Sequence, residues 1–208
     1  MEQGLDRFIK AQKAFYKEAL EEIRQGQKQS HWMWFIFPQI IGLGQSETAQ
    51  YYSIKNLQEA KDFLNDEVLG ANLREISEAL LKVDSNDAEE VMGWPDDMKL
   101  RSSMTLFSLA TKENGIFRKV MDKFFGGRPD AQTVDILSMG HLVTRIDDPD
   151  FGCEGRPDGE EAMGKVYLTE LKTEEEIQIE IPDAELYRKE INEGDEVALS
   201  PDGVILKL

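Results

Sequence analysis

The chain has little cysteine and no long apolar run, and each scarcity excludes a class of protein. Cys153 is the only cysteine in 208 residues, so no disulfide forms within the chain and a reducing compartment is expected. No stretch approaches the roughly 20 apolar residues that span a bilayer. Residues 1–6 also lack the basic region and apolar run of a secretory signal. We therefore expect a cytoplasmic protein that does not enter a membrane.

Histidine is scarce as well, which limits metal and catalytic chemistry. The two histidines, His31 and His141, lie far apart in the sequence and have no ligand groups at metal spacing. The acidic stretch Asp147–Glu154 misses the spacing of a known calcium loop, so we interpret it as a solvated turn. The sequence contains neither a Walker loop nor a nucleophile elbow. We therefore expect no metal and no cofactor.

Basic residues are outnumbered throughout the chain. The 24 Lys and Arg residues face 41 Asp and Glu residues, which gives a formal net charge of -17. Such a surface repels phosphate backbones and anionic lipids, so direct binding of nucleic acid or membranes is not expected. The hydrophobic fraction of 40% is nevertheless sufficient for a packed core.

The acidic charge is concentrated in the second half of the chain. Residues 1–138 carry 17 basic and 22 acidic residues, a net charge of -5, whereas residues 139–208 carry 7 and 19, a net charge of -12. The periodicity of the apolar residues changes from helical to alternating at the same place. This coincidence predicts two domains, a helical domain of residues 1–138 and an acidic β-rich module of residues 139–208.

The first half has apolar residues at helical spacing and predicts an all-α domain of about six helices. Asn56 and Glu59 have the form of a capping box at the start of the second helix. Pro95 stands where a later helix begins, and Gly126 stands where the next one ends. The expected helices cover approximately residues 5–23, 57–64, 73–81, 95–109, 116–125 and 131–137.

The second half alternates apolar and polar residues in short runs, which is typical of β-strands. One helix, Ala184–Ile191, is expected between the third and fourth strands. Five short strands in about 70 residues predict a small curled sheet or partial barrel. The expected strands are His141–Ile146, Lys165–Leu168, Ile177–Ile181, Glu196–Leu199 and Val204–Leu208.

An aromatic segment, Ser30–Gln39, contains four aromatic rings and a histidine within ten residues. In one interpretation Trp32 and Trp34 stack on a flat ligand, and Gln39 reads the ligand's edge through paired hydrogen bonds. In the other, these rings simply form the centre of a core. His31 has the intrinsic chemistry of an acid or base near neutral pH, although a lone histidine is more often a structural donor.

Two further segments invite a functional interpretation. The turn Gly42–Thr48 exposes backbone N–H groups that favour phosphate, but a plain turn followed by a helix N-cap explains it equally simply. In the later expected helix, Lys99, Arg101 and Ser102 are suited to hold an anion such as a pyrophosphate. The alternative there is an ion pair between Asp97 and Arg101, which are four residues apart on a helix.

Residues 5 to about 137 resemble the bacterial domain-of-unknown-function 1810 family. This resemblance implies an all-helical domain without an established biochemical activity. The order of helices, followed by a methionine-rich segment and a Phe-rich helix, is also faintly similar to NADAR domains, which act on ADP-ribosyl groups. The segments that carry the family resemblance are Leu5–Gln12, Ser30–Gln39, Gly42–Gly44 and Lys99–Phe107.

These residues lead to a first functional hypothesis, a helical pocket that binds a nucleotide or ADP-ribose-like ligand and, in one version, hydrolyses it. The ring would be held by aromatic and amide side chains, the phosphates by basic and hydroxyl side chains, and any proton transfer would use an imidazole or a carboxylate. The residues for the ring are Trp32, Trp34 and Gln39. Those for the phosphates are Lys99, Arg101 and Ser102. Proton transfer would use His31 or Asp97.

The second hypothesis is a protein-interaction module without catalysis. Here the aromatic segment is core, and the acidic module of residues 139–208 attracts a basic protein partner. The two hypotheses differ in whether Gln39, Arg101 and His31 face one solvent-reachable pocket.

Overall fold

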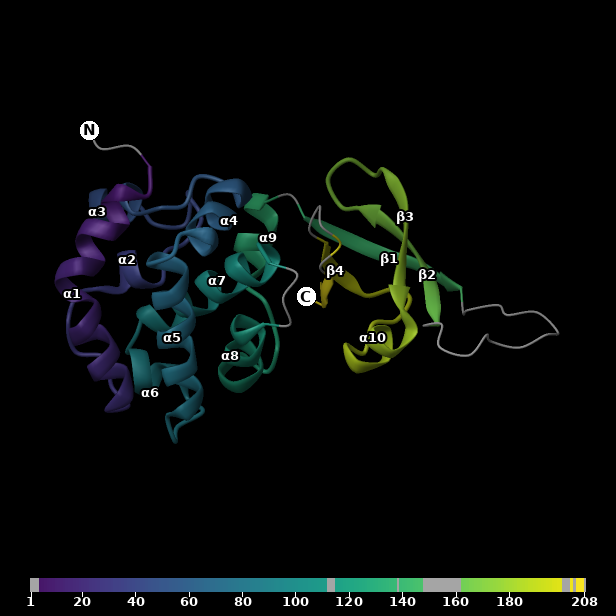
Figure 1. Cartoon of the computed structure of the whole chain (residues 1–208). Helices are drawn as coiled ribbons and strands as arrows, with labels where there is room; N and C mark the ends of the chain where they lie inside the picture. Colours follow the sequence, from purple (N-terminus) through teal and green to yellow (C-terminus); the bar gives the residue numbers. More distant parts are fainter. Residues whose placement is uncertain are drawn as a thin grey trace. The chain divides into compact units, whose positions relative to one another are not determined.

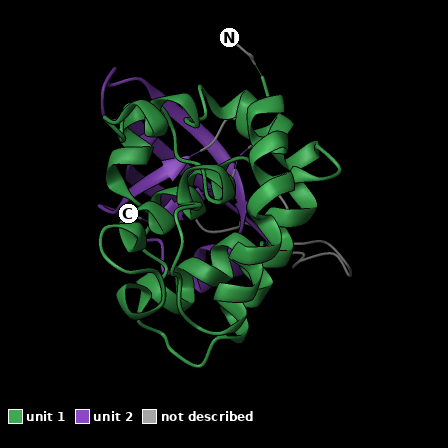
Figure 2. Cartoon of the chain, turned by 90° about the vertical axis from the view of Figure 1, so that its left-hand side faces the viewer, with its two compact units in different colours: residues 1–137 green, residues 138–208 purple. Residues whose placement is uncertain are grey.

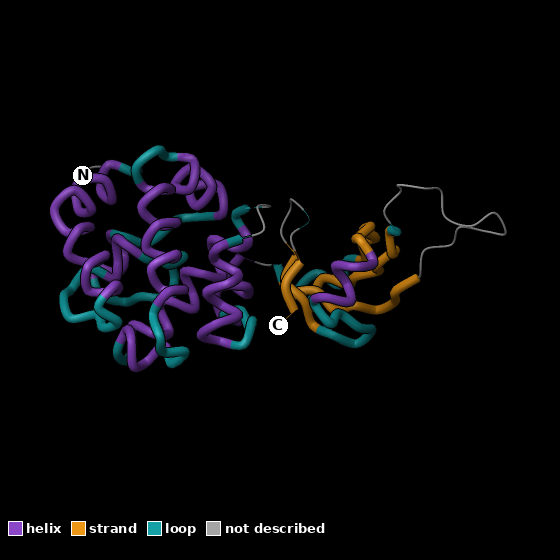
Figure 3. Tube along the Cα trace, turned by 60° about the horizontal axis from the view of Figure 1, so that its bottom comes forward, coloured by secondary structure: helices purple, strands orange, loops and turns teal. Residues whose placement is uncertain are grey.

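The computed structural model describes residues 4–111, 115–137, 139–147, 162–199, 203 and 205–207. The chain divides into two compact units, residues 1–137 (unit 1) and residues 138–208 (unit 2) (Figure 2). Cys153 and most of the acidic stretch of residues 147–154 lie outside the described residues. Helices build unit 1, whereas the described strands all belong to unit 2 (Figure 3).

Unit 1 contains nine helices in its described residues, so the expectation of about six was too low. The three additional helices, α2, α3 and α6, are four or five residues long, too short for an apolar periodicity to reveal them. The nine are α1 (Asp6–Arg24), α2 (Met33–Ile36), α3 (Glu47–Tyr51), α4 (Leu57–Asn65), α5 (Leu69–Lys82), α6 (Ala88–Met92), α7 (Asp96–Leu109), α8 (Ile116–Phe125) and α9 (Ala131–Leu137).

The predicted cap of α4 is formed. The Asn56 side chain accepts a hydrogen bond from the N–H of Glu59 at 2.9 Å, which satisfies a donor of the first turn. The Glu59 carboxylate accepts the N–H of Lys55 at 2.7 Å and pairs with the buried guanidinium of Arg7 at 2.9 Å. One short motif therefore both starts α4 and ties it to α1.

The centre of unit 1 is α7, which is buried along most of its length and contacts α4, α6, α8 and α9 (Figure 1). Four buried phenylalanines from α1, α4, α7 and α8 form a continuous row through this core. Their ring centroids are 5.1 Å apart for Phe8 and Phe63, 5.3 Å for Phe63 and Phe107, and 5.8 Å for Phe107 and Phe117. Such tilted or edge-to-face contacts add to the stabilisation that burial supplies.

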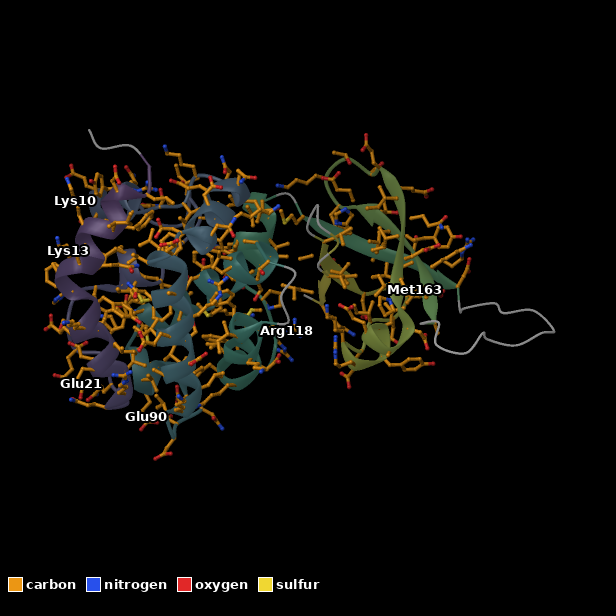
Figure 4. All side chains as sticks on the ribbon, in the orientation of Figure 1. Lys10, Lys13, Glu21, Glu90, Arg118 and Met163 are labelled. Carbon is orange, nitrogen blue, oxygen red and sulfur yellow. The ribbon has the colours of Figure 1, made fainter. Side chains whose placement is uncertain are left out.

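The α1 helix covers one side of this core and contacts α2 and α5. Lys10, Lys13 and Glu21 project outward from α1 (Figure 4), whereas Phe8 and Ile23 point inward and are fully buried. This division into a polar and an apolar face is the amphipathic pattern expected of a surface helix. None of the described helices combines the length and apolar character needed to cross a membrane.

Unit 2 contains a five-stranded antiparallel sheet with the strand order β3-β2-β1-β4-β5. All five expected strands are present, as is the helix between the third and fourth. The edge strands β3 and β5 do not pair with each other, so the described strands form an open sheet that is not closed into a barrel. The elements are β1 (Gly140–Asp147), β2 (Met163–Glu170), β3 (Glu176–Pro182), α10 (Asp183–Arg188), β4 (Glu196–Leu199) and β5 (Ile205–Lys207).

One face of this sheet carries the core of unit 2, and α10 contacts β2 and β3 (Figure 1). Leu186 of α10 and Ile191 just after it belong to the same buried cluster as Val166, Leu168 and Ile181 of the sheet. The alternation of buried and exposed positions along β2 is the pattern of a strand with one covered face.

We expect Phe107→Ala to lower the free energy of unfolding of unit 1 by about 3–5 kcal/mol, because it removes the middle of the phenylalanine row. Urea unfolding followed by tryptophan fluorescence measures this, since all three tryptophans lie in unit 1. The control is Met98→Ala in the same helix, where the side chain is 60% exposed. There the expected change is within about 0.5 kcal/mol. Equal losses in both variants would contradict a core centred on α7.

Candidate ligand-binding pocket

The conformation of the aromatic segment depends on the buried carboxylate of Glu22, near the end of α1. This carboxylate accepts hydrogen bonds from the N–H groups of Gln29 at 2.8 Å and Ser30 at 3.0 Å, and from the indole Nε1 of Trp32 at 2.7 Å. Burial by itself would raise the pKa of Glu22, but a hydrogen bond from the Ser30 hydroxyl, together with these N–H donors, holds the pKa below its usual value. A single charged group therefore positions the chain between α1 and α2.

Trp32 is consequently a core residue, and its predicted role in stacking on a ligand is not supported. Its side chain is fully buried, with the indole N–H directed to Glu22. The Nζ of Lys28 lies 5.1 Å from the Trp32 ring centroid and covers it further. A flat ligand has no access to this ring.

Trp34 has the opposite environment, although it is only two residues further along. It is partly exposed and lines a pocket of about 320 Å³. Gln39, Lys99 and Ser102 line the same pocket. The structure thus brings together four of the six predicted ligand-binding residues, from the aromatic segment and from α7.

The remaining walls of this pocket come from three other places in unit 1. The loop before α3 contributes Gly44 and Ser46, the first turns of α7 contribute Met98, and the start of α9 contributes Asp130 and Gln132. A Cβ on Gly44 would lie only 2.4 Å from the Cβ of Ala49, so this position requires glycine. The Ser46 hydroxyl accepts the N–H of Ala49 at 3.2 Å, which confirms the N-cap interpretation of this turn.

Lys99 presents a positive charge beside the Trp34 ring. Its Nζ lies 5.3 Å from the ring centroid and 2.6 Å from the Oδ1 of Asp96. The other oxygen of Asp96 lies 2.7 Å from the Nζ of Lys28. Two lysines therefore share one carboxylate, and each lies over one of the two tryptophans of the aromatic segment.

This shared carboxylate is strongly committed to its charged form. Burial would raise the pKa of Asp96, but the hydrogen bonds from Lys28 and Lys99 lower it below the usual value of an aspartate. Asp96 therefore remains ionised at neutral pH and fixes both ammonium groups.

The floor of the pocket is a hydrogen-bonded chain between α7 and α9. The buried hydroxyl of Ser102 lies 2.8 Å from the hydroxyl of Thr133. Thr133 in turn donates to the Asp130 carboxylate at 2.7 Å through its hydroxyl and at 2.8 Å through its N–H. Asp130 thus caps the first turn of α9, and its charge is used there.

The other predicted site residues do not line this pocket. Arg101 donates instead to the backbone carbonyls of Arg128 at 3.0 Å and Pro129 at 2.9 Å, which holds the loop before α9. Arg101 makes these backbone hydrogen bonds in place of the ion pair with Asp97 that the sequence offered as an alternative, and its role as a phosphate ligand stays a prediction. His31 is exposed and Asp97 is partly buried, and neither of these two alternative acid–base candidates is among the lining residues of the pocket.

Comparison with known proteins assigns the family of unit 1. The family described as "Protein of unknown function (DUF1810)" matches residues 2–137. The chain belongs to this family. The crystal structure of the conserved hypothetical protein Rv1873 from Mycobacterium tuberculosis is similar, with 45% sequence identity and a TM-score of 0.63. The match covers 64% of this chain and 95% of that chain. No curated protein matches the chain.

The resemblance predicted from the sequence is therefore confirmed, and the pocket lies wholly within the DUF1810 region. Several features near this pocket were not predicted from the sequence. Trp94 is 74% exposed and directly precedes Pro95, which lines the pocket. Asp130, which precedes α9, and Gln132, in its first turn, also line the pocket.

The described residues of this DUF1810 protein contain no group of three or more His, Cys, Asp or Glu side chains placed to hold a metal ion. The described pocket residues offer one aromatic ring, amide groups, hydroxyls, one ammonium group and the carboxylate of Asp130. This set is suited to binding a polar, flat molecule through stacking and hydrogen bonds.

We expect Trp32→Phe to lower the free energy of unfolding of unit 1 by about 1–3 kcal/mol, because the buried carboxylate of Glu22 loses a donor. Trp34→Phe is the matched control, since Trp34 is partly exposed and a phenyl ring keeps most of its contacts. Urea unfolding monitored by the remaining tryptophans measures both variants. A loss confined to Trp34→Phe would refute the assignment of Trp32 to the core.

We expect Asp96→Asn to destabilise unit 1 by about 1–2 kcal/mol at pH 7, because two ammonium groups lose their shared carboxylate. The lowered pKa of Asp96 makes its contribution present at neutral pH and lost as the pH falls below about 4. The difference between wild type and variant should therefore shrink in that range. Asp122→Asn, which breaks an exposed pair with Arg118, should cost less than about 0.5 kcal/mol. Urea titrations at several pH values measure this. A difference between wild type and variant that is the same at every pH would contradict the role assigned to Asp96.

Proposed function

We propose that unit 1 binds a nucleotide or ADP-ribose-like ligand in the pocket lined by Trp34, Gln39 and Lys99. The observation that carries this proposal is the meeting of a partly exposed indole, an amide and an ammonium group in one pocket of about 320 Å³. A base joined to a phosphate requires three groups: an aromatic ring on which the base stacks, a side chain that forms hydrogen bonds with the edge of the base, and a cation for the phosphate.

The base is assigned to Trp34 and Gln39. Stacking of a base on an aromatic side chain contributes about 1–3 kcal/mol and tolerates different bases. The Gln39 amide offers both a donor and an acceptor, which suits the edge of a purine or a nicotinamide. Its backbone is held in place, because its carbonyl accepts the N–H of Ile54 at 2.8 Å.

The anionic group is assigned to Lys99. Of the described residues that line the pocket, Lys99 alone is cationic. Its partner Asp96 also bonds to the Nζ of Lys28, which does not line the pocket, so the charge of Asp96 is not balanced by Lys99 alone. The lining carboxylate of Asp130 is directed into the first turn of α9, where its charge is favourably placed.

The size of the pocket favours one nucleotide unit. A volume of about 320 Å³ lies at the lower end of the range found for small-molecule sites, roughly 300–1,000 Å³. One base with its sugar and phosphate suits this volume better than both halves of a dinucleotide. The proposal is limited to binding, because neither His31 nor Asp97 lines the pocket.

Titration of the full chain with AMP, ADP, ADP-ribose and NAD, read by tryptophan fluorescence and thermal shift, tests this function. We expect Lys99→Met to weaken binding of the preferred ligand about tenfold or more, since about 1.4 kcal/mol of charge-assisted bonding is lost. Trp34→Leu should weaken it by a similar factor through the loss of stacking.

Lys28→Met is the matched control. Lys28 bonds to the same Asp96 and lies over a tryptophan just as Lys99 does, but it does not line the pocket. Its replacement should change stability and leave ligand affinity within about twofold. If both lysine variants weaken binding equally, or if none of the four ligands binds, the proposed function is wrong.

A further inference from the structure

A groove of about 570 Å³ lies on unit 2 beside α10. Its apolar lining consists of Leu186 and Ile191, which are buried, and Ile146, which packs against the core of the unit. Tyr187 lines the same groove and is 75% exposed. An exposed aromatic ring beside a buried aliphatic surface is typical of a protein-binding site, where tyrosine is a frequent anchor.

The groove is rimmed by carboxylates. Asp183, Glu190 and Glu193 line it, and Lys207 is the one cation among its described lining residues. The ammonium group of Lys207 is already engaged, since it lies 2.7 Å from the Oδ2 of Asp195 and 2.7 Å from the backbone carbonyl of Glu190. The rim is therefore negative, in agreement with the net charge of -12 in residues 139–208.

Glu190 has a backbone conformation that is unusual for its side chain. Its φ of 52° lies in the left-handed region, directly after the C-cap of α10. The N–H of Ile191 donates to the carbonyl of Leu186 at 3.1 Å, and the N–H of Glu190 donates to that of Tyr187 at 3.1 Å. Glycine is the usual residue at such a helix end. A glutamate here keeps a carboxylate on the rim in spite of the backbone strain.

We propose that this groove binds a basic segment of a partner protein. An aliphatic side chain of the segment packs on Leu186 and Ile191 beside Tyr187, and flanking lysines or arginines pair with Asp183 and Glu190. Charge complementarity selects this occupant, because Asp183, Glu190 and Glu193 outnumber the one lining cation, Lys207, and an acidic segment would be repelled by this rim.

The test uses the full chain and a short fluorescein-labelled peptide in which one leucine stands between pairs of lysines. Binding is followed by fluorescence anisotropy at low and high salt. We expect saturable binding that weakens with salt, because the charges on the rim are exposed. The same peptide with glutamates in place of its lysines should not bind.

Glu190→Gly should weaken binding of the lysine peptide about fivefold. Because glycine adopts this φ without strain, the variant should melt at the same temperature as the wild type or higher. Tyr187→Ala should weaken binding about tenfold. Since Tyr187 is 75% exposed, this second variant should also fold normally, which circular dichroism checks.

The matched control is Glu174→Gly, in the turn between β2 and β3. Glu174 is the other non-glycine residue with a positive φ among the described residues, at 59°, and it does not line the groove. The variant therefore removes the same charge and the same strain as Glu190→Gly at a different place. Its affinity for the lysine peptide should match that of the wild type.

Three results would overturn the proposal. Equal weakening by Glu174→Gly and Glu190→Gly would mean that the peptide responds only to net charge. Unchanged binding by Tyr187→Ala would mean that the peptide does not bind in the groove. Equal affinity for a peptide with serine in place of leucine would indicate a site for polyamine-like cations, without an apolar anchor.

Discussion

The buried carboxylate of Glu22 is the constraint on which the pocket of unit 1 depends. It collects the N–H groups of Gln29, Ser30 and the Trp32 indole, and so determines how the chain leaves α1. A buried charge is stable only when its hydrogen bonds are made, and here these three N–H groups and the Ser30 hydroxyl make them. With Trp32 fixed inside, Trp34 is left at the surface beside α7. The hydrogen bond from Trp32 to Glu22 thus buries one tryptophan of the aromatic segment and leaves the other partly exposed.

A second carboxylate, Asp96, joins the aromatic segment to α7. It holds Lys28 over Trp32 and Lys99 over Trp34, so the two lysine–tryptophan contacts form one connected arrangement. Both ammonium groups bond to the carboxylate of Asp96, so a movement of either lysine disturbs the carboxylate that the other lysine contacts. Asp96 thereby holds the ammonium group of Lys99 beside the pocket. The strongest electrostatic contact of the site is therefore also a link between two elements of the fold.

The two units present different chemistry on their surfaces. The pocket of unit 1 combines a ring, amides and a single ammonium group, whereas the groove of unit 2 combines an apolar floor with carboxylates. The first is suited to a small flat anion, and the second to a cationic partner with an aliphatic side chain. The net charges of the two halves, -5 and -12, agree with this difference, because the half that contains the groove is the more acidic one. The proposed small-molecule site and the proposed protein-binding surface are compatible on one chain, because each unit has its own core.

Local sequence patterns were sufficient for the long helices and for all five strands, because apolar periodicity and capping residues such as Asn56 act over a few neighbouring positions. They were insufficient for α2, α3 and α6, which are shorter than the periods that reveal a helix. Family membership also followed from the sequence alone. The roles of Trp32 and Trp34, by contrast, were decided by tertiary structure. Two tryptophans in one short segment look equivalent until Glu22, ten residues before the first, accepts one indole N–H and leaves the other ring at the surface.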